Sequence, residues 1–325
     1  MKLERILIGV ALLCSGVTGW AQGWSPQKNV EIIATSVPGG SQDKTARTIE
    51  RVLLAHKLVT STLTVVNKSG GGGNIAFTYV FQRAGDPHYL VIAGTGLLSN
   101  HILGASKITY TDLTPIASLA NDYIVIAVNA DSPLKTGKDL AERLRKDPQS
   151  LSIGFANAFG STRHISTAIL MRTLGGNPRD LKTVVFKGSA EAIVALLGGH
   201  IDVVSTGATN ATVHVASGKM RIIGVGAPQR FGGTLAGAPT WKEQGVDFVS
   251  GTSRGIAAPK DLTAAQVAFW EETLRKVTAT DEWKTELERN YWFNDFMPSA
   301  QFRKELEKEY AATKAVLVEL GLAKQ

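Results

Sequence analysis

Three glycine-rich turns hold the residues of this chain best suited to bind an anion: "SVPGGSQDKTAR" at 36–47, "NKSGGGGNIA" at 67–76 and "GFANAFGSTRHI" at 154–165. Each turn follows a short apolar run and precedes a pattern with helical spacing. The first N–H groups of a helix have no partner inside it, and the helix dipole makes that end positive. Because glycine has no Cβ, an anion can approach such backbone closely. We therefore expect a shared anion pocket, the alternative being that the glycines serve only the geometry of the turns.

Nucleotide binding and catalysis find little support in the sequence. No G-x-x-x-x-G-K-[ST] loop occurs, and "GGGGNIA" fits a dinucleotide fingerprint poorly because the acidic residue expected about 20 positions later is missing. G-x-S-x-G is absent, and the six histidines lack metal-ligand spacing. We expect no cofactor, no metal and no enzymatic activity. Asp43, His164 and Asp202 are predicted to brace the backbone through hydrogen bonds.

The N-terminus is typical of a secretory signal peptide. Lys2 and Arg5 precede an apolar stretch at 6–17, and Gly19 and Ala21 supply small residues at positions −3 and −1. We expect residues 1–21 to be removed after Ala21 and the mature protein to be periplasmic, with an uncleaved anchor as the alternative. Cys14 is the only cysteine and leaves with this segment. The mature chain would then have no disulfide and no zinc–thiolate site.

The charge of the chain is modest and dispersed. The net charge of +7 becomes +6 without Lys2, Arg5 and Glu4, and no run of five like charges occurs. Nucleic acid would need a concentrated basic stripe, so we expect no nucleic-acid partner. A weak positive field could attract a small anion. "RKELEKEY" at 303–310 mixes both signs and is predicted to be a solvated helix face.

Strand and helix patterns alternate along nearly the whole chain. This order predicts an α/β protein with mostly parallel sheet, and about 300 residues suggest two domains. Predicted strands are 29–36, 63–67, 89–96, 123–129, 151–157 and 183–187, followed by two more near 200–206 and 220–227 and a return strand at 254–259. Helices are predicted after 41 and at 75–82, 163–174, 189–197, 263–277 and 299–320.

Many segments in the same order resemble the periplasmic solute-binding proteins of tripartite tricarboxylate transporters, the TctC or Bug family. They include "PGGSQDKTAR" (38–47), "DLTPIASL" (112–119), "ADSPLKTGKDL" (130–140), "GSTRHI" (160–165), "ALLGGHIDV" (195–203) and "RGIAAPKDL" (254–262). "APTWKEQGVDF" and "EWKTELERNYW" are most similar to the tricarboxylate-binding branch. The resemblance covers nearly the whole mature chain.

The resemblance implies a two-lobed periplasmic-binding-protein fold of the Venus-flytrap type, each lobe a mostly parallel sheet flanked by helices. Lobe 1 would hold residues 22–127 and 251–325, lobe 2 residues 128–250, with hinges near 127–129 and 251–254. Such a protein captures a small carboxylate (tricarboxylate, dicarboxylate or aromatic) and delivers it to a membrane permease with a large and a small integral subunit. We expect a monomer. The alternatives are a carboxylate sensor that signals to a membrane histidine kinase, and a secreted α/β enzyme whose nucleophile and base are not found.

The resemblance also implies which residues hold the ligand. The main candidates are Pro38, Gly39, Gly40 and Ser41 of the first turn and Asn157, Ala158, Gly160, Ser161 and Thr162 of the third turn. Two other segments are secondary candidates, which we call the second-tier segments: Gly94, Thr95 and Gly96, and Thr206, Gly207 and Ala208. Three residues depart from the family pattern: Phe155 and Phe159 interrupt the third turn, and Arg163 precedes His164. Either Phe159 lines the pocket and Arg163 meets a second carboxylate, or Phe155 packs in the core and Arg163 faces solvent.

Overall fold

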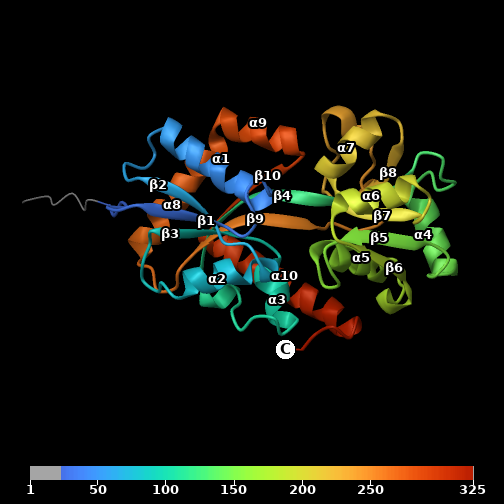
Figure 1. Cartoon of the computed structure of the whole chain (residues 1–325), viewed down its shortest axis with the longest axis horizontal. Coiled ribbons are helices and arrows are strands. Elements are labelled where there is room, and N and C mark those ends of the chain that lie inside the picture. Colours follow the sequence, from blue (N-terminus) through green and yellow to red (C-terminus); the bar gives the residue numbers. More distant parts are fainter. Residues whose placement is uncertain (1–22, 325) are drawn as a thin grey trace, which may run out of the picture.

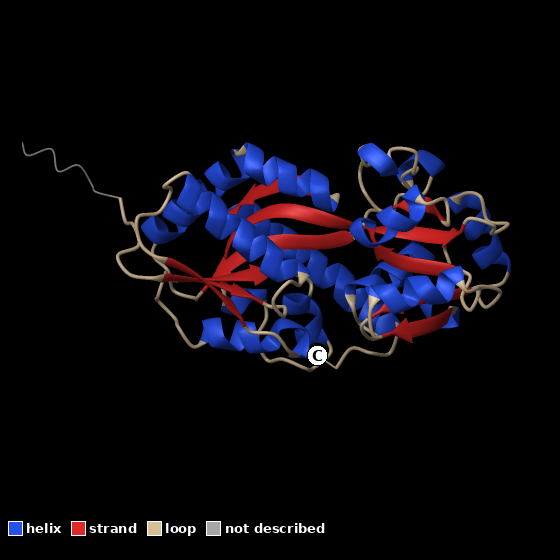
Figure 2. Cartoon of the chain, turned by 45° about the horizontal axis from the view of Figure 1, so that its top comes forward, coloured by secondary structure: helices blue, strands red, loops and turns tan. Residues whose placement is uncertain are grey.

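Two lobes lie side by side in the computed structural model, and one long strand runs through both (Figures 1 and 2). The structure describes residues 23–324, so the predicted signal peptide lies outside the described residues. Within this range the strands form one continuous sheet in the order β2-β1-β3-β9-β4-β7-β5-β6, with β8 and β10 also paired to β4.

The first lobe combines parallel strands from the N-terminal part of the chain with antiparallel strands that return later. Its strands are β1 (Val30–Ala34), β2 (Leu63–Asn67), β3 (Tyr89–Ala93), the first part of β4 (Thr114–Asn129), β9 (Gly251–Ala258) and β10 (Phe293–Pro298). One face packs on α1 (Ser41–Ala55), α8 (Ala264–Ala279) and α9 (Asp281–Asn290). The other face packs on α2 (Asn74–Phe81), α3 (Gly96–Ile102) and α10 (Ser299–Glu319).

The second lobe repeats this layering on a smaller scale. Its strands are β5 (Ser152–Ala156), β6 (Lys182–Phe186), β7 (Val203–Gly207), β8 (Met220–Val225) and the last part of β4. Helices α4 (Gly137–Lys146) and α5 (Thr162–Thr173) cover one face. Helices α6 (Ser189–Leu197) and α7 (Ala208–Ala216) cover the other. The parallel strands of both lobes therefore point their carboxyl ends at the junction, which is where ligands bind in open α/β sheets.

Local sequence signals account for several of these elements. Thr136 and Asp139 form a capping box at the start of α4, and Thr263 and Gln266 do the same for α8. The apolar side of α1 is fully buried and lies against Trp270 of α8. Other elements had no clear sequence signal: β10, α9 and α7 were not predicted, and β4 begins nine residues before the predicted strand at 123–129.

Strand β4 changes its partner in the middle of the molecule. Up to Tyr123 it pairs with β9, and from Ile124 it pairs with β7 and β8. Strand β9 begins at Gly251, opposite Tyr123. We call the paired segments of β4 and β9 the interlobe ribbon. The change of partner after Tyr123 lies a few residues before the hinge predicted at 127–129. Gly251 lies within the second predicted hinge, 251–254. The positions about which the lobes rotate stay a prediction.

Helix α10 joins the two lobes on one side of this ribbon. It packs on β4, on α3 of the first lobe and on α5 of the second. Near its end, Leu317 is fully buried in a cluster with Ile102 of α3 and Ile165 of α5. Figure 1 shows its red C-terminal half beneath the junction. None of the helices described is both long and apolar enough to cross a membrane.

Gly255 in β9 is expected to be intolerant of a side chain because α10 packs directly on it. A Cβ at this position would lie 2.1 Å from Cζ of the buried Phe302. We predict that Gly255→Ala lowers the free energy of unfolding by about 1–3 kcal/mol through overpacking. Urea unfolding checks this value. The control is Gly237→Ala, where nothing lies within 4 Å of the added Cβ; equal effects of the two variants would contradict the prediction.

Candidate functional site

The two faces of the interlobe ribbon carry different chemistry. Side chains alternate along a strand, so Asp122 and Arg254 point to one face while Tyr123 and Ser253 point to the other. Tyr123 and Ser253 line a cavity, and Asp122 and Arg254 do not. The ribbon thus separates a cluster of arginines from a polar cavity.

Arg254 is the centre of the first face. It is only 2% exposed, and its Nη2 donates to Asp122 Oδ2 at 2.9 Å and to Ser41 Oγ at 2.7 Å. Its guanidinium carbon lies 3.5 Å from the ring centroid of Trp292. Burial lowers the pKa of Arg254, and the charge of Asp122 opposes this. The ion pair therefore ties the first glycine-rich turn to the strand that crosses between the lobes.

Arg163 approaches the same carboxylate from the second lobe. It belongs to the first turn of α5, and no described residue accepts a hydrogen bond from its guanidinium, whose Nε is buried. A Cβ on Gly207 would lie 3.3 Å from Arg163 Nη2 and 3.5 Å from Asp122 Oδ1, so both groups border the end of β7. Burial lowers the pKa of Arg163, and Asp122 opposes this. The sequence left open whether Arg163 meets a ligand carboxylate or faces solvent. Its buried Nε does not fit an arginine that faces solvent.

Together Asp122, Arg163 and Arg254, which we call the arginine cluster, hold two cations and one anion, and of these residues Arg254 is buried while Asp122 and Arg163 are half-buried. Four buried polar atoms around them have no partner among the described residues: Asp122 Oδ1, Arg163 Nε, Thr206 Oγ1 and Arg254 Nε. An unpaired charge or donor away from water is costly. Three of these atoms, Arg163 Nε, Arg254 Nε and Thr206 Oγ1, can donate, so the cluster favours an added anion that accepts hydrogen bonds from them, whereas Asp122 Oδ1 needs a donor.

The first turn contributes Ser41 to this cluster, while the rest of it faces outward. Pro38 and Gly39 are exposed, and Gly40 is half-buried. Asp43 Oδ2 accepts from the backbone N–H of Gly39 at 2.8 Å. Burial alone would raise the pKa of Asp43, but hydrogen bonds from Arg47, Gly39 and Asn67 lower it. Asp43 thus braces the turn and is not free to meet a ligand carboxylate.

The third turn is partly consumed by its own hydrogen bonds. Asn157, Ala158 and Phe159 are exposed, whereas Ser161 Oγ donates to the Ala156 carbonyl at 3.1 Å. His164 Nδ1 accepts from the Gly160 N–H at 3.0 Å, and burial lowers the pKa of His164 to about 4. Phe155 is fully buried, and Phe159 remains 53% exposed. His164 therefore has a bracing position, as does Asp202, whose Oδ2 accepts from Ser152 N and Oγ at 2.7 and 2.6 Å.

The second-tier segments divide between the two faces of the ribbon. Thr206, Gly207 and Ala208 are buried at the end of β7, beside the arginine cluster. Gly94, Thr95 and Gly96 are half-buried after β3, and Gly96 packs against the Gly72 carbonyl of the second glycine-rich turn. Of the predicted ligand residues, only Thr95 and Thr162 line the cavity on the opposite face.

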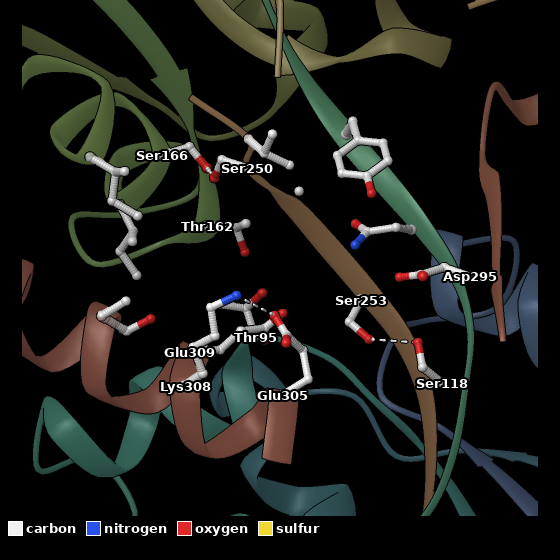
Figure 3. Close-up of a pocket in the computed structure, with 18 of the residues that line it drawn as sticks. Thr95, Ser118, Thr162, Ser166, Ser250, Ser253, Asp295, Glu305, Lys308 and Glu309 are labelled. Carbon is white, nitrogen blue, oxygen red and sulfur yellow. Dashed lines mark hydrogen bonds and ion pairs between the residues drawn. The ribbon is translucent and has the colours of Figure 1, made fainter. Parts of the chain in front are cut away.

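That cavity measures about 360 Å³ and lies between the ribbon, α5 and α10 (Figure 3). We call it the α10 cavity. Its walls carry many hydroxyls, two of which pair as Ser118–Ser253 and two as Ser166–Ser250. Figure 3 shows Asp295, Glu305 and Glu309 around it, with Lys308 beside Glu305. Because two of these acids belong to the stretch at 303–310, the prediction of a purely solvated face was wrong there.

Sequence reasoning also missed Asp122 and Arg254. Asp122 directly precedes the buried run 123–128 of β4, in "NDYIVIAVN", and Arg254 is the second buried residue of β9, in "RGIAAP". A charged residue at the entrance of an otherwise apolar run was the available signal, because such a charge must be paired once it is buried.

Contact between the lobes at Gly160 gives a second structural prediction. Gly160 has φ +79°, and a Cβ there would lie 2.7 Å from Leu103 Cδ1 of the first lobe. We predict that Gly160→Ala lowers the free energy of unfolding by about 1–2 kcal/mol from backbone strain. The clash with Leu103 lowers it further, and the added substitution Leu103→Ala should remove that second contribution. Gly175→Ala is the matched control, since its φ is +84° and nothing lies within 4 Å. Identical unfolding energies for the two alanine variants would show that the contact with Leu103 costs nothing.

The charge of Glu309 makes stability depend on pH. Burial, and then Glu305 and Asp295, raise the pKa of Glu309 to about 7, with Lys308 opposing. An acid whose pKa is raised by folding is stabilising below its unfolded pKa and loses that contribution as pH rises through about 7. We predict that Glu309→Gln is more stable than wild type at pH 8 by on the order of 1–3 kcal/mol, and not at pH 4.5. Urea unfolding at both values measures this. Glu307→Gln, an exposed change on the same helix, should show no such difference, and a pH-independent effect of Glu309→Gln would contradict the prediction.

Comparisons with known proteins agree with this architecture. The family model described as the tripartite tricarboxylate transporter family receptor, TctC, matches residues 46–322. The "UPF0065 protein in gbd 5'region" of Cupriavidus necator is 27% identical over 303 residues, covering 92% of this chain and 89% of that protein. A solved TctC solute binding protein from Polaromonas has a TM-score of 0.79 at 26% identity, over 91% of this chain and 99% of that one. A structure of an R. palustris protein with adipate has a TM-score of 0.73 at 24% identity, over 92% and 99% of the two chains. The fold is that of α/β periplasmic binding proteins, as predicted.

Proposed function

The chain belongs to the TctC family of tripartite tricarboxylate transporter receptors, and on that premise we propose that it captures a small carboxylate between its lobes and hands it to the integral membrane subunits of such a transporter. It is a solute-binding receptor and not an enzyme. The tricarboxylate branch, the identity of the ligand and the permease of two integral subunits are parts of the proposal.

The observation that carries the proposal is the unmatched positive charge of the arginine cluster. Asp122 pairs with Arg254, which leaves the buried Nε of Arg163 without a partner. A carboxylate has two acceptor oxygens and suits a guanidinium, which presents its donors in a planar fork. Arg163 also adds its charge to the positive end of α5. The adipate in the R. palustris structure supports the same ligand class, since adipate is a dicarboxylate.

Lobe closure supplies the second part of the proposed mechanism. Ser41 and Arg254 belong to the first lobe, and Arg163 and Gly207 to the second. A ligand that contacts both sets stabilises the arrangement in which they are close. Closure also excludes water, which strengthens each electrostatic contact. The hinges would lie where β4 and β9 cross, near Tyr123 and Gly251.

A thermal-shift screen of residues 22–325, unfolded and refolded to remove carried-over ligand, tests this function. The panel is citrate, tricarballylate, malate, succinate, adipate, phthalate and benzoate, with ATP and NADH as controls. A ligand at 100 times its Kd stabilises by about 2.7 kcal/mol, which raises Tm by several degrees in a protein of this size. We expect one or two carboxylates and neither nucleotide to do so. A response to the nucleotides alone would overturn the proposal.

The arginine contribution is tested with the carboxylate that binds best. Arg163→Gln is expected to weaken its affinity about 10–100-fold, the value of a hydrogen bond to a charged group. Arg172→Gln is the control, because Arg172 lies on the same helix and pairs only with Glu319 at the surface. Calorimetric titration measures both. Unchanged affinity in Arg163→Gln would remove the arginine cluster from the binding site while leaving the family function intact.

A further inference from the structure

The α10 cavity has the wrong charge for a carboxylate. Asp295 of β10 and Glu305 and Glu309 of α10 face it, against the single cation Lys308. Lys308 Nζ lies 3.6 Å from Glu305 Oε1, and its side chain is 78% exposed. Neither Asp295 nor Glu309 forms an ion pair with a described cation, and Lys308 offsets the charge of Glu309 only in part. Their mutual repulsion would be relieved by a positive group placed between the ribbon and α10.

A buried tyrosine without a hydrogen-bond partner is a second observation that points to a missing ligand. Tyr123 is 7% exposed and lines the cavity, yet no described residue forms a hydrogen bond with its hydroxyl. Tyr123 and the three acids line the same cavity, and burial, with the charges of Asp295, Glu305 and Glu309, raises the pKa of Tyr123 to about 12. Asn121 Oδ1, on the same face of the ribbon, is buried without a partner. Asn121 hydrogen-bonds to the Asp295 carboxylate, which leaves its own oxygen and that of Tyr123 able to accept from a donor in the cavity.

The shape and lining of the cavity restrict what that donor is. Among residues 23–324 no group of three or more acidic, His or Cys side chains has the arrangement of a metal site, so the carboxylates do not converge on a bare ion. Apolar side chains of α5 and of the segment before β9 also line the cavity: Ile165, Ile169 and Val249. A volume of about 360 Å³ holds a molecule of several carbons. These features suit a short hydrocarbon that ends in a charged donor.

We propose that the α10 cavity binds a protonated primary amine on a short aliphatic chain. The ammonium lies between Asp295 and Glu309 and donates to both carboxylates, with the Tyr123 hydroxyl oxygen as a further acceptor. The hydrocarbon packs against Ile165 and Ile169 (Figure 3 shows the acids of α10 and β10 around this space). The site lies on the face of the ribbon opposite the arginine cluster, so it goes beyond the proposed carboxylate function and does not depend on it.

Two sources could supply this amine, and a four-carbon series separates them. Putrescine is a free diamine, whereas 4-aminobutyrate carries its amine on a carboxylate that can accept hydrogen bonds from cavity hydroxyls such as those of Thr95 and Thr162. Succinate has the same chain length without an amine. Calorimetric titration of refolded residues 22–325 at pH 8 is the measurement, because Glu309 is ionised there while the amines are still protonated. We expect at least one amine to bind with a Kd below 1 mM.

Variants of the two unpaired acids test the location. Asp295→Asn and Glu309→Gln are each expected to weaken amine binding at least tenfold. Neither variant should change the affinity for the best carboxylate of the thermal-shift panel, because none of those carboxylates carries an amine. Glu307→Gln, on an exposed face of α10, is the control and should bind the amine like wild type. Melting curves recorded beforehand establish that each variant is folded. If one of the two acid variants does not fold, the other still tests the location.

Each result decides the proposal. Binding of 4-aminobutyrate alone supports an amine carried by a carboxylate, binding of putrescine supports a free amine, and in either case both acid variants must weaken it. Heat from neither amine at 10 mM, or binding that survives in both acid variants, overturns the proposal. A failure of every carboxylate in the panel counts against the carboxylate function alone, because the amine site lies on the other face of the ribbon.

Discussion

The ion pair between Arg254 and Asp122 joins the parts of this molecule that must stay in register. It links β9 to β4, and through Ser41 it holds the first glycine-rich turn against the crossing strands. Both charges are withdrawn from water, so loss of either partner would leave the other uncompensated at a cost of about 3–5 kcal/mol. The pair also decides where charge is left over, since a carboxylate already engaged by Arg254 cannot fully neutralise Arg163. Stability of the junction and readiness to accept an anion thus arise from the same three side chains.

The interlobe ribbon keeps opposite charges apart by strand geometry alone. Adjacent residues on a strand point to opposite faces, so Asp122 and Tyr123 enter different environments although they are neighbours in sequence. The arginine cluster lies on one face, and the acids of β10 and α10 lie around a cavity on the other. A solute that approaches the junction therefore meets a positive and a negative region separated by the thickness of one sheet. This arrangement can discriminate among small molecules by the sign and position of their charges as well as by their size.

The family, the α/β fold and the approximate order of elements could be predicted from the sequence, because glycine turns, β-branched runs and helix caps are local signals. The strands at 63–67 and 183–187 show this, as β2 and β6 are nearly as predicted. β10 was not recognised, because "FNDFMP" contains a central aspartate and ends in proline. Arg163 could be singled out from the sequence, but its meeting with Asp122 and Arg254 could not, because the three come together only after two lobes have folded and β4 has crossed between them. Likewise, Glu305 and Glu309 differ from the solvated acids of α10 only in what packs opposite them.

Helix α10 has a consequence for how tightly any solute is held. Its C-terminal end rests on both lobes through Leu317, Ile102 and Ile165, so separating the lobes exposes apolar surface that is now dry. This raises the free energy of the open form in the absence of any ligand. If solutes enter only through that form, the helix slows both entry and escape and lengthens the residence time without a single contact to the solute. The exchange rate of cargo, and hence the rate at which a membrane partner can be supplied, would then be set partly by the last three turns of the chain.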